Sequence, residues 1–216
     1  LHRPLVLPGS GQYEGPVKLF DLRVDLLVVL FLALAAVDHL SVVTWARGWY
    51  DRQVANGVNP ARWIEYSISA SVMVVLIGLL AGIDQITAVI AIFGVNAAMI
   101  LFGLVMEQVN SGREPGDVNW TPFTFGCIAG AVPWIAIAAQ LAISSSKGGE
   151  APAFVYVIFV TLIILFNTFA LNMWLQYRGK GRWSSAIHAE RVYLWLSLAA
   201  KSALAWQVYF GALAGS

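Results

Sequence analysis

A lysine stands about halfway along an apolar segment that is long enough to cross a membrane. In LAAKSALAWQ (198–207), Lys201 lies nine or more residues from either end of the apolar stretch 192–213. Nine helical residues rise about 14 Å, which is more than a lysine side chain can span to reach the headgroups. A charge at that depth costs about 2.5 to 3.5 kcal/mol, so Lys201 needs a partner or a covalent modification. A structural ion pair, an ion pathway and a Schiff base on a deprotonated lysine all remain open.

Few acidic residues lie deep enough to pair with Lys201. Glu65 follows Arg62 by three residues in ARWIEYSISASVM (61–73), so the two share one helix face. One interpretation is a solvated charge pair at a helix start. A buried role for Glu65 is favoured by the hydroxyls that follow it into the membrane, although small residues also serve helix packing. Counted along the two spans, Glu65 and Lys201 are offset by roughly 10 Å, which side-chain reach and helix tilt must close.

Other polar residues at membrane depth are candidates for the same site. Ser197 precedes Lys201 by one helical turn and could hydrogen-bond to whatever replaces its ammonium. Asp38 and His39 lie near the middle of the first apolar run. If Glu65 is a surface charge, Asp38 is the next candidate partner of Lys201.

The composition predicts a polytopic membrane protein. Hydrophobic residues make up 59% of the 216 residues and charged residues 12%, against about 25% charged in a typical soluble domain. The net charge of +1 gives no sign of a nucleic-acid partner. The single cysteine, Cys127, excludes an intrachain disulfide, and no metal site is predicted.

Six apolar runs are long enough to cross a hydrocarbon core of about 30 Å, which takes about 20 helical residues. Each run is apolar on all sides, as expected of helices in a membrane bundle. We therefore predict an all-α membrane protein, with one transmembrane domain over residues 21–216. The six runs are 25–46, 63–82, 86–106, 121–143, 153–176 and 192–213.

Residues 1–20 differ from the rest of the chain. Two short apolar runs flank PGSGQ (8–12), which predicts a β-hairpin outside the membrane. The connecting loops 47–62, 107–120 and 177–191 carry eight basic residues, against four on the other side of the predicted membrane. Because basic loops stay in the cytoplasm, these three loops are predicted to be cytoplasmic. The hairpin and the C-terminus would then be extracellular.

Three segments resemble the heliorhodopsins, inverted relatives of the microbial rhodopsins. They are RWIEYSISASVM (62–73), LNMWLQYRGKGRW (171–183) and YLWLSLAAKSALAWQ (193–207), and the resemblance extends over all six spans and QYEGPVKLF (12–20). It implies a seven-helix bundle whose first helix would precede residue 1, leaving six spans here. The family's extracellular C-terminus agrees with the placement reached from the loop charges.

The resemblance implies a retinal chromophore. Lys201 would carry all-trans retinal as a protonated Schiff base, isomerised by light about the C13=C14 bond, with Glu65 as counterion and Ser197 as a hydrogen-bond partner. His39 would belong to a polar cluster near the Schiff base, or would make a satisfied interhelical hydrogen bond. The side chains that could line the polyene, some of them plain core, are Met73, Phe166, Phe169, Trp174, Trp206 and Gln207.

The same residues indicate a light-sensing photoreceptor and neither an ion pump nor an enzyme. Pump-type rhodopsins carry an aspartate one turn before the lysine, where this chain has Ser197. The resemblance also implies a homodimer in the lipid bilayer, with the hairpin reaching over a neighbour or capping the retinal side; the signalling partner stays unknown. Two alternatives remain open. One is a channel or transporter using an intramembrane Lys–Glu pair. The other is a haem or quinone enzyme, for which His39 is the one candidate ligand at depth.

Overall fold

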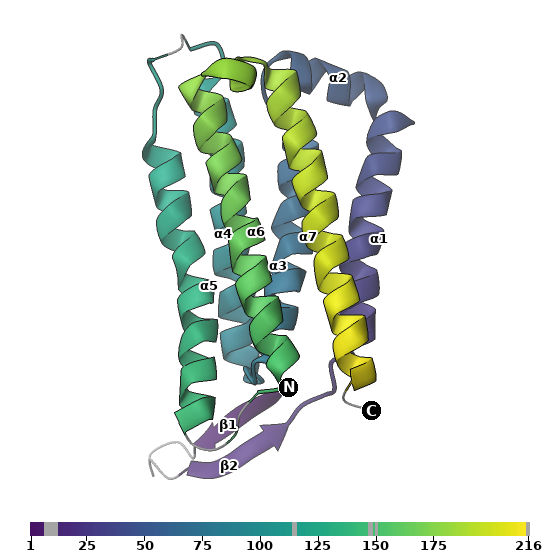
Figure 1. Cartoon of the computed structure of the whole chain (residues 1–216), viewed down its shortest axis with the longest axis vertical. Helices are drawn as coiled ribbons and strands as arrows, with labels where there is room; N and C mark the ends of the chain where they lie inside the picture. The colour runs from purple at the N-terminus through teal and green to yellow at the C-terminus, as the bar shows by residue number, and fades with distance from the viewer. Residues whose placement is uncertain (7–12, 114–115, 147–148, 150, 215–216) are drawn as a thin grey trace.

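The computed structural model describes residues 1–6, 13–113, 116–146, 149 and 151–214. It confirms an all-α membrane protein with a two-stranded sheet near the N-terminus (Figure 1). The elements are β1 (His2–Val6), β2 (Tyr13–Lys18), α1 (Val24–Val43), α2 (Arg47–Ala55), α3 (Pro60–Leu80), α4 (Ile86–Asn110), α5 (Thr121–Ser146), α6 (Ala153–Arg178), the 3₁₀ turn η1 (Gly181–Ser184) and α7 (Ala186–Ala214).

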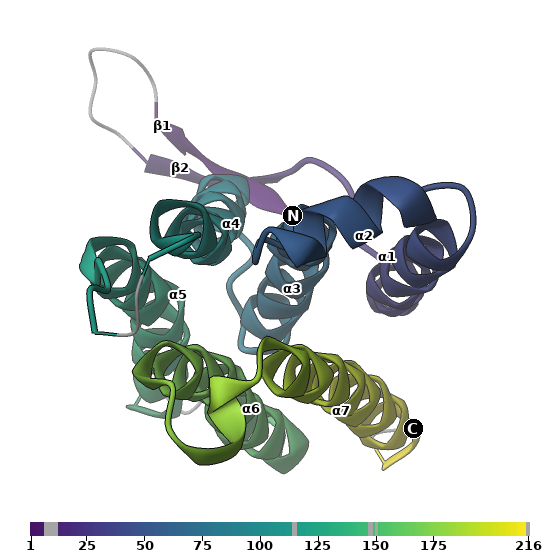
Figure 2. The ribbon, with the colours of Figure 1, turned by 90° about the horizontal axis from the view of Figure 1, so that it is seen from above.

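Five of the six predicted spans are helices long and apolar enough to cross a membrane: α1, α3, α4, α5 and α6. The sixth lies inside α7, whose 29 residues would extend about 43 Å. Polar side chains such as Lys201 and Gln207 make α7 less apolar than the other five helices. It nevertheless runs alongside them, next to α6 and near α3 (Figures 1 and 2).

The central element is α3. In its most apolar stretch 72% of the residues are buried, compared with 6% in α1 and at most 28% in the other candidate spans. Pro60 occupies the first turn, where its missing N–H is not needed, and the Asn59 side chain accepts a hydrogen bond from Arg62 N at 3.2 Å. The side chains of Met73, Leu76 and Ile77 then fill the core between the surrounding helices. Side chains of α4 and α7 that point toward the centre of the bundle therefore contact α3.

The predicted hairpin is present as two antiparallel strands. His2 pairs with Lys18 and Pro4 with Pro16, while the predicted turn PGSGQ lies outside the described residues. The hairpin is fixed to the α3–α4 connection, because His2 Nδ1 lies 2.8 Å from Asp84 Oδ2 and His2 N donates to Asp84 O. The strands lie at the end of the bundle where α7 ends (Figure 1).

The segment 47–62, predicted as a loop, contains the nine-residue helix α2. Its residues form no apolar stripe that a sequence pattern could reveal, and none of them is buried. An exposed Arg47–Asp51 pair at 3.7 Å adds local support to the helix. Likewise α7 begins at Ala186, six residues before the predicted span, and η1 lies in the preceding turn. Figure 1 shows α2 and η1 at the same end of the bundle, opposite the hairpin.

Helices α3 and α4 pack tightly at Gly103, where an added Cβ would overlap the Trp63 ring. We expect Gly103→Ala to destabilise the protein by about 1 to 3 kcal/mol, because the buried indole must move. Gly94→Ala is the matched control in the same helix, since nothing lies within 4 Å of its Cβ. Thermal unfolding of both variants in mild detergent measures the difference, and equal melting temperatures would contradict this packing.

Candidate functional site

Lys201 and Glu65 form a buried ion pair between α7 and α3. Lys201 Nζ donates to both carboxylate oxygens of Glu65, at 3.0 and 3.1 Å, and to Ser197 Oγ at 3.0 Å. The side chains of the pair are 7% and 6% exposed. The offset of roughly 10 Å counted from the sequence is therefore closed. The structure brings together the three residues expected to act on each other, with one cation facing one carboxylate.

Tyr66 is a neighbour of this pair that the sequence interpretation missed. Lys201 Nζ lies 4.9 Å from the centroid of its ring, within the range of a cation–π interaction. The Tyr66 hydroxyl donates to the backbone oxygen of Tyr193 at 3.1 Å, which fixes the ring against α7. The only sequence signal for the role of Tyr66 was that it directly follows Glu65.

Arg62 does not pair with Glu65. Its guanidinium bonds to Glu107 of α4 and Glu190 of α7, and it lies over the Tyr193 ring at 4.1 Å. Asn59 supports both carboxylates: its backbone N–H donates to Glu107 at 2.7 Å and its side-chain amide to Glu190 at 3.1 Å. This second cluster pairs Arg62 with two carboxylates other than Glu65, so the charge of Glu65 is left for Lys201.

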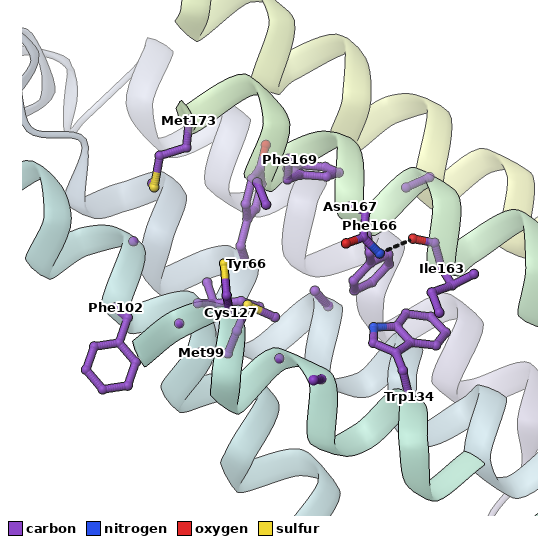
Figure 3. A pocket seen from close by; sticks show the side chains of 18 of the residues that line it. Tyr66, Met99, Phe102, Cys127, Trp134, Ile163, Phe166, Asn167, Phe169 and Met173 are labelled. Atoms are coloured by element: carbon purple, nitrogen blue, oxygen red, sulfur yellow. Dashed lines mark hydrogen bonds between the residues drawn. The ribbon is translucent and has the colours of Figure 1, made fainter. Parts of the chain in front are cut away.

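A cavity of about 430 Å³ adjoins the lysine and lies between α3, α4, α5, α6 and α7. This volume falls in the range of small-molecule sites, which are mostly apolar with a few polar groups. Figure 3 shows Met99 of α4, Trp134 of α5 and three residues of α6 around it, namely Phe166, Phe169 and Met173. Of the predicted site residues, those in the lining are Met73, Phe166, Phe169, Ser197 and Lys201.

Three predicted lining residues lie elsewhere. Trp174 is 38% exposed and has the Arg178 guanidinium over its ring, whereas Trp206 is 59% exposed and stacks on Phe210. Gln207 donates to Thr161 Oγ1 at 3.1 Å. The sequence interpretation missed the lining residues of α4 and α5, because similar aromatic and sulfur side chains on the same two helices, such as Phe93, Met106 and Phe125, lie outside the lining.

Asp38 and His39 line a second, polar cavity between α1, α2, α3 and α7. His39 Nδ1 lies 3.9 Å from Asp38 Oδ2, and within the described part of the chain it makes no hydrogen bond to another helix. Tyr66 lines both cavities, so the polar one reaches toward the lysine site. At its outer end burial raises the pKa of Tyr50 in α2 above its ordinary value, because the charged phenolate loses contact with water.

The family model of the heliorhodopsins matches residues 6–213 of the 216. The chain belongs to the heliorhodopsin family. A search among curated proteins gave no match. Heliorhodopsins are retinal-binding, rhodopsin-like membrane proteins, and the residues of this one fit such a chromophore. An apolar cavity of suitable volume carries one lysine on its wall, and that lysine already faces a carboxylate.

Proposed function

We propose that this heliorhodopsin is a light sensor in which Lys201 holds all-trans retinal as a protonated Schiff base and Glu65 is the counterion. The observation that supports this is the contact of Lys201 Nζ with both Glu65 oxygens at the wall of the apolar cavity. When bound, retinal would supply a light-driven isomerisation about its C13=C14 bond. Of the other lysines in the described residues, Lys18 and Lys180 are exposed and lie outside the membrane spans.

Each neighbouring side chain has a role that follows from its position. The negative charge of Glu65 offsets the desolvation of a buried cation at the nitrogen of Lys201. Ser197 adds a hydrogen-bond partner one turn away, and Tyr66 places its ring beside the same nitrogen. Trp134, Phe166 and Phe169 give the cavity an apolar wall that excludes water. His39 remains a candidate member of a polar cluster near the Schiff base, because it lines the second cavity, which Tyr66 separates from the lysine.

Reconstitution with retinal tests the proposal. The purified protein should develop a visible absorption band on addition of all-trans retinal, and light with hydroxylamine should bleach it. Extraction in the dark should return all-trans retinal. A channel or transporter using the same Lys–Glu pair would conduct ions without colour, so a colourless protein would contradict the light sensor.

Sustained illumination is expected to drive no net proton transport. The position one turn before Lys201 is Ser197, so Glu65 is the one carboxylate in contact with Lys201 among the described residues. The acids toward the hairpin end, Asp25 and Asp84, are exposed at helix ends, so no buried acid in the described spans continues a relay in that direction. Light-induced pH changes in a suspension of expressing cells measure this, with a known proton-pumping rhodopsin as control. A steady pH change that an uncoupler removes would show that the protein pumps.

We further propose that the end carrying α2 and η1 faces the cytoplasm and that the protein is a homodimer in the bilayer. The excess of basic residues at that end supports the orientation. Protease added to intact cells should then cleave the hairpin and spare the 177–191 turn. Mass measurement in mild detergent tests the dimer, and a monodisperse monomer would contradict it.

A further inference from the structure

The connection between α6 and α7 and the two helix ends that flank it present four cations without a balancing carboxylate. Arg178, Lys180, Arg182 and Arg191 are all exposed. The segment's single acid, Glu190, turns inward, where it forms an ion pair with Arg62 and accepts a hydrogen bond from the Asn59 side chain. Within the described residues none of the four cations contacts a carboxylate. We call Arg178, Lys180, Arg182 and Arg191 the basic turn.

Neighbouring connections at the same end of the bundle differ from the basic turn. Arg47 in α2 lies 3.7 Å from Asp51, and Arg113 after α4 lies 3.2 Å from Asp117. Residues 111–120 carry two acids against one arginine, and residues 47–58 carry one acid against two. The positive charge of this end is therefore concentrated on one connection.

The basic turn is also held in a fixed shape. Trp183 Nε1 donates to Asn172 Oδ1 at 2.8 Å, and the buried Asn172 amide donates in turn to Ala189 O at 3.2 Å. The Trp183 ring meets the His188 ring edge-on at 5.1 Å. One asparagine thus joins α6, η1 and α7, so an anion that binds here pays little entropy to order the backbone.

The position of Trp174 sets the level of the basic turn in the membrane. Trp174 is 38% exposed on α6, and Arg178, one turn further on, lies 5.0 Å above its ring. Exposed tryptophans of membrane helices gather at the interface between lipid tails and headgroups. Arg178 and the residues beyond it therefore lie at the level of the phosphates, which a soluble acidic protein reaches less easily than lipid does.

We propose that the basic turn is a binding site for anionic phospholipid headgroups. Its four cations, which have no carboxylate partners, attract the phosphates. The backbone that carries them is already ordered, and Trp174 places them at the depth of the lipid phosphates. Each lysine or arginine near the surface of a membrane strengthens binding to anionic lipids by about fivefold. The site is separate from the lysine cavity and does not depend on retinal.

Spin-labelled lipids test the proposal on the full-length protein in phosphatidylcholine vesicles. The fraction of spin-labelled phosphatidylglycerol that the protein immobilises is compared with that of spin-labelled phosphatidylcholine, at low and high salt. We expect a preference for phosphatidylglycerol that salt weakens. In Lys180→Gln/Arg182→Gln the relative association constant of the anionic lipid should fall by more than tenfold at the preferred sites.

Arg47→Gln/Arg113→Gln is the matched control, because it removes two cations from the same end that already have carboxylate partners. It should keep most of the preference. An equal loss in both double variants would show that only overall charge matters, and would overturn the site. Absence of any anionic preference in the unmodified protein would overturn it as well, and would direct attention to an acidic protein partner.

Discussion

Lys201→Ala should abolish the visible band of the retinal-treated protein. An alanine carries no amine, and within the described residues no other lysine reaches the cavity. The measurement is an absorption spectrum after addition of retinal, followed by denaturation in acid to detect any chromophore that stays covalently attached. A covalently attached chromophore in this variant would refute the assignment of Lys201.

Removing the lysine also leaves Glu65 buried without its partner, which costs about 3 to 5 kcal/mol and could unfold the protein. Lys201→Arg separates the two effects. It keeps a cation near Glu65, but a guanidinium does not form a Schiff base under these conditions because it stays protonated. A folded, colourless Lys201→Arg protein would therefore attribute the loss of the band to chemistry. Circular dichroism and gel filtration report the folding of both variants.

Glu65→Gln should move the visible band in two ways. The buried protonated nitrogen loses its compensating negative charge, so the proton should leave at a pH lower by several units. The maximum of the protonated form should shift to longer wavelength, because excitation moves positive charge away from the nitrogen and the counterion otherwise favours the ground state. A pH titration of the absorption spectrum measures both effects in one experiment.

Glu107→Gln is the control for this titration. Glu107 is also a buried carboxylate, but its partners among the described residues are Arg62 and Asn59 and do not include Lys201. It should alter stability more than colour. If Glu65→Gln leaves the maximum and the titration midpoint unchanged, the counterion lies elsewhere, and Asp38, which lines the polar cavity beside Tyr66, is the next residue to change.

The sequence predicted the membrane helices and the pairing of Lys201 with Glu65 because both depend on strong local signals. A run of about 20 apolar residues has few alternatives to a spanning helix, and a single lysine in such a run needs a partner that few acids can supply. The partners of Arg62 could not be predicted in the same way. Glu107 and Glu190 lie 45 and 128 residues away, and each looks like an ordinary polar residue at a helix end.

The lining of the cavity was predicted only in part for a related reason. Phe166 and Phe169 face inward while Trp174 and Trp206 face outward, yet all four are aromatic residues in apolar helices. On a helix that is apolar all round, hydrophobic periodicity does not mark the buried face. The direction of each face follows from how the helices pack, which depends on contacts between distant parts of the chain.

The two ion clusters attach α7 to α3 at two heights. Glu190 and Lys201 are 11 residues apart on α7, which corresponds to about 16 Å, and their partners Arg62 and Glu65 are three residues apart on α3. The Glu190 attachment does not involve the nitrogen of Lys201. If the charge at Lys201 is lost, the attachment nearer the hairpin weakens while the one at Glu190 remains. The C-terminal half of α7, which ends beside the hairpin, would then be held mainly by its packing against α6 and by the Gln207–Thr161 hydrogen bond.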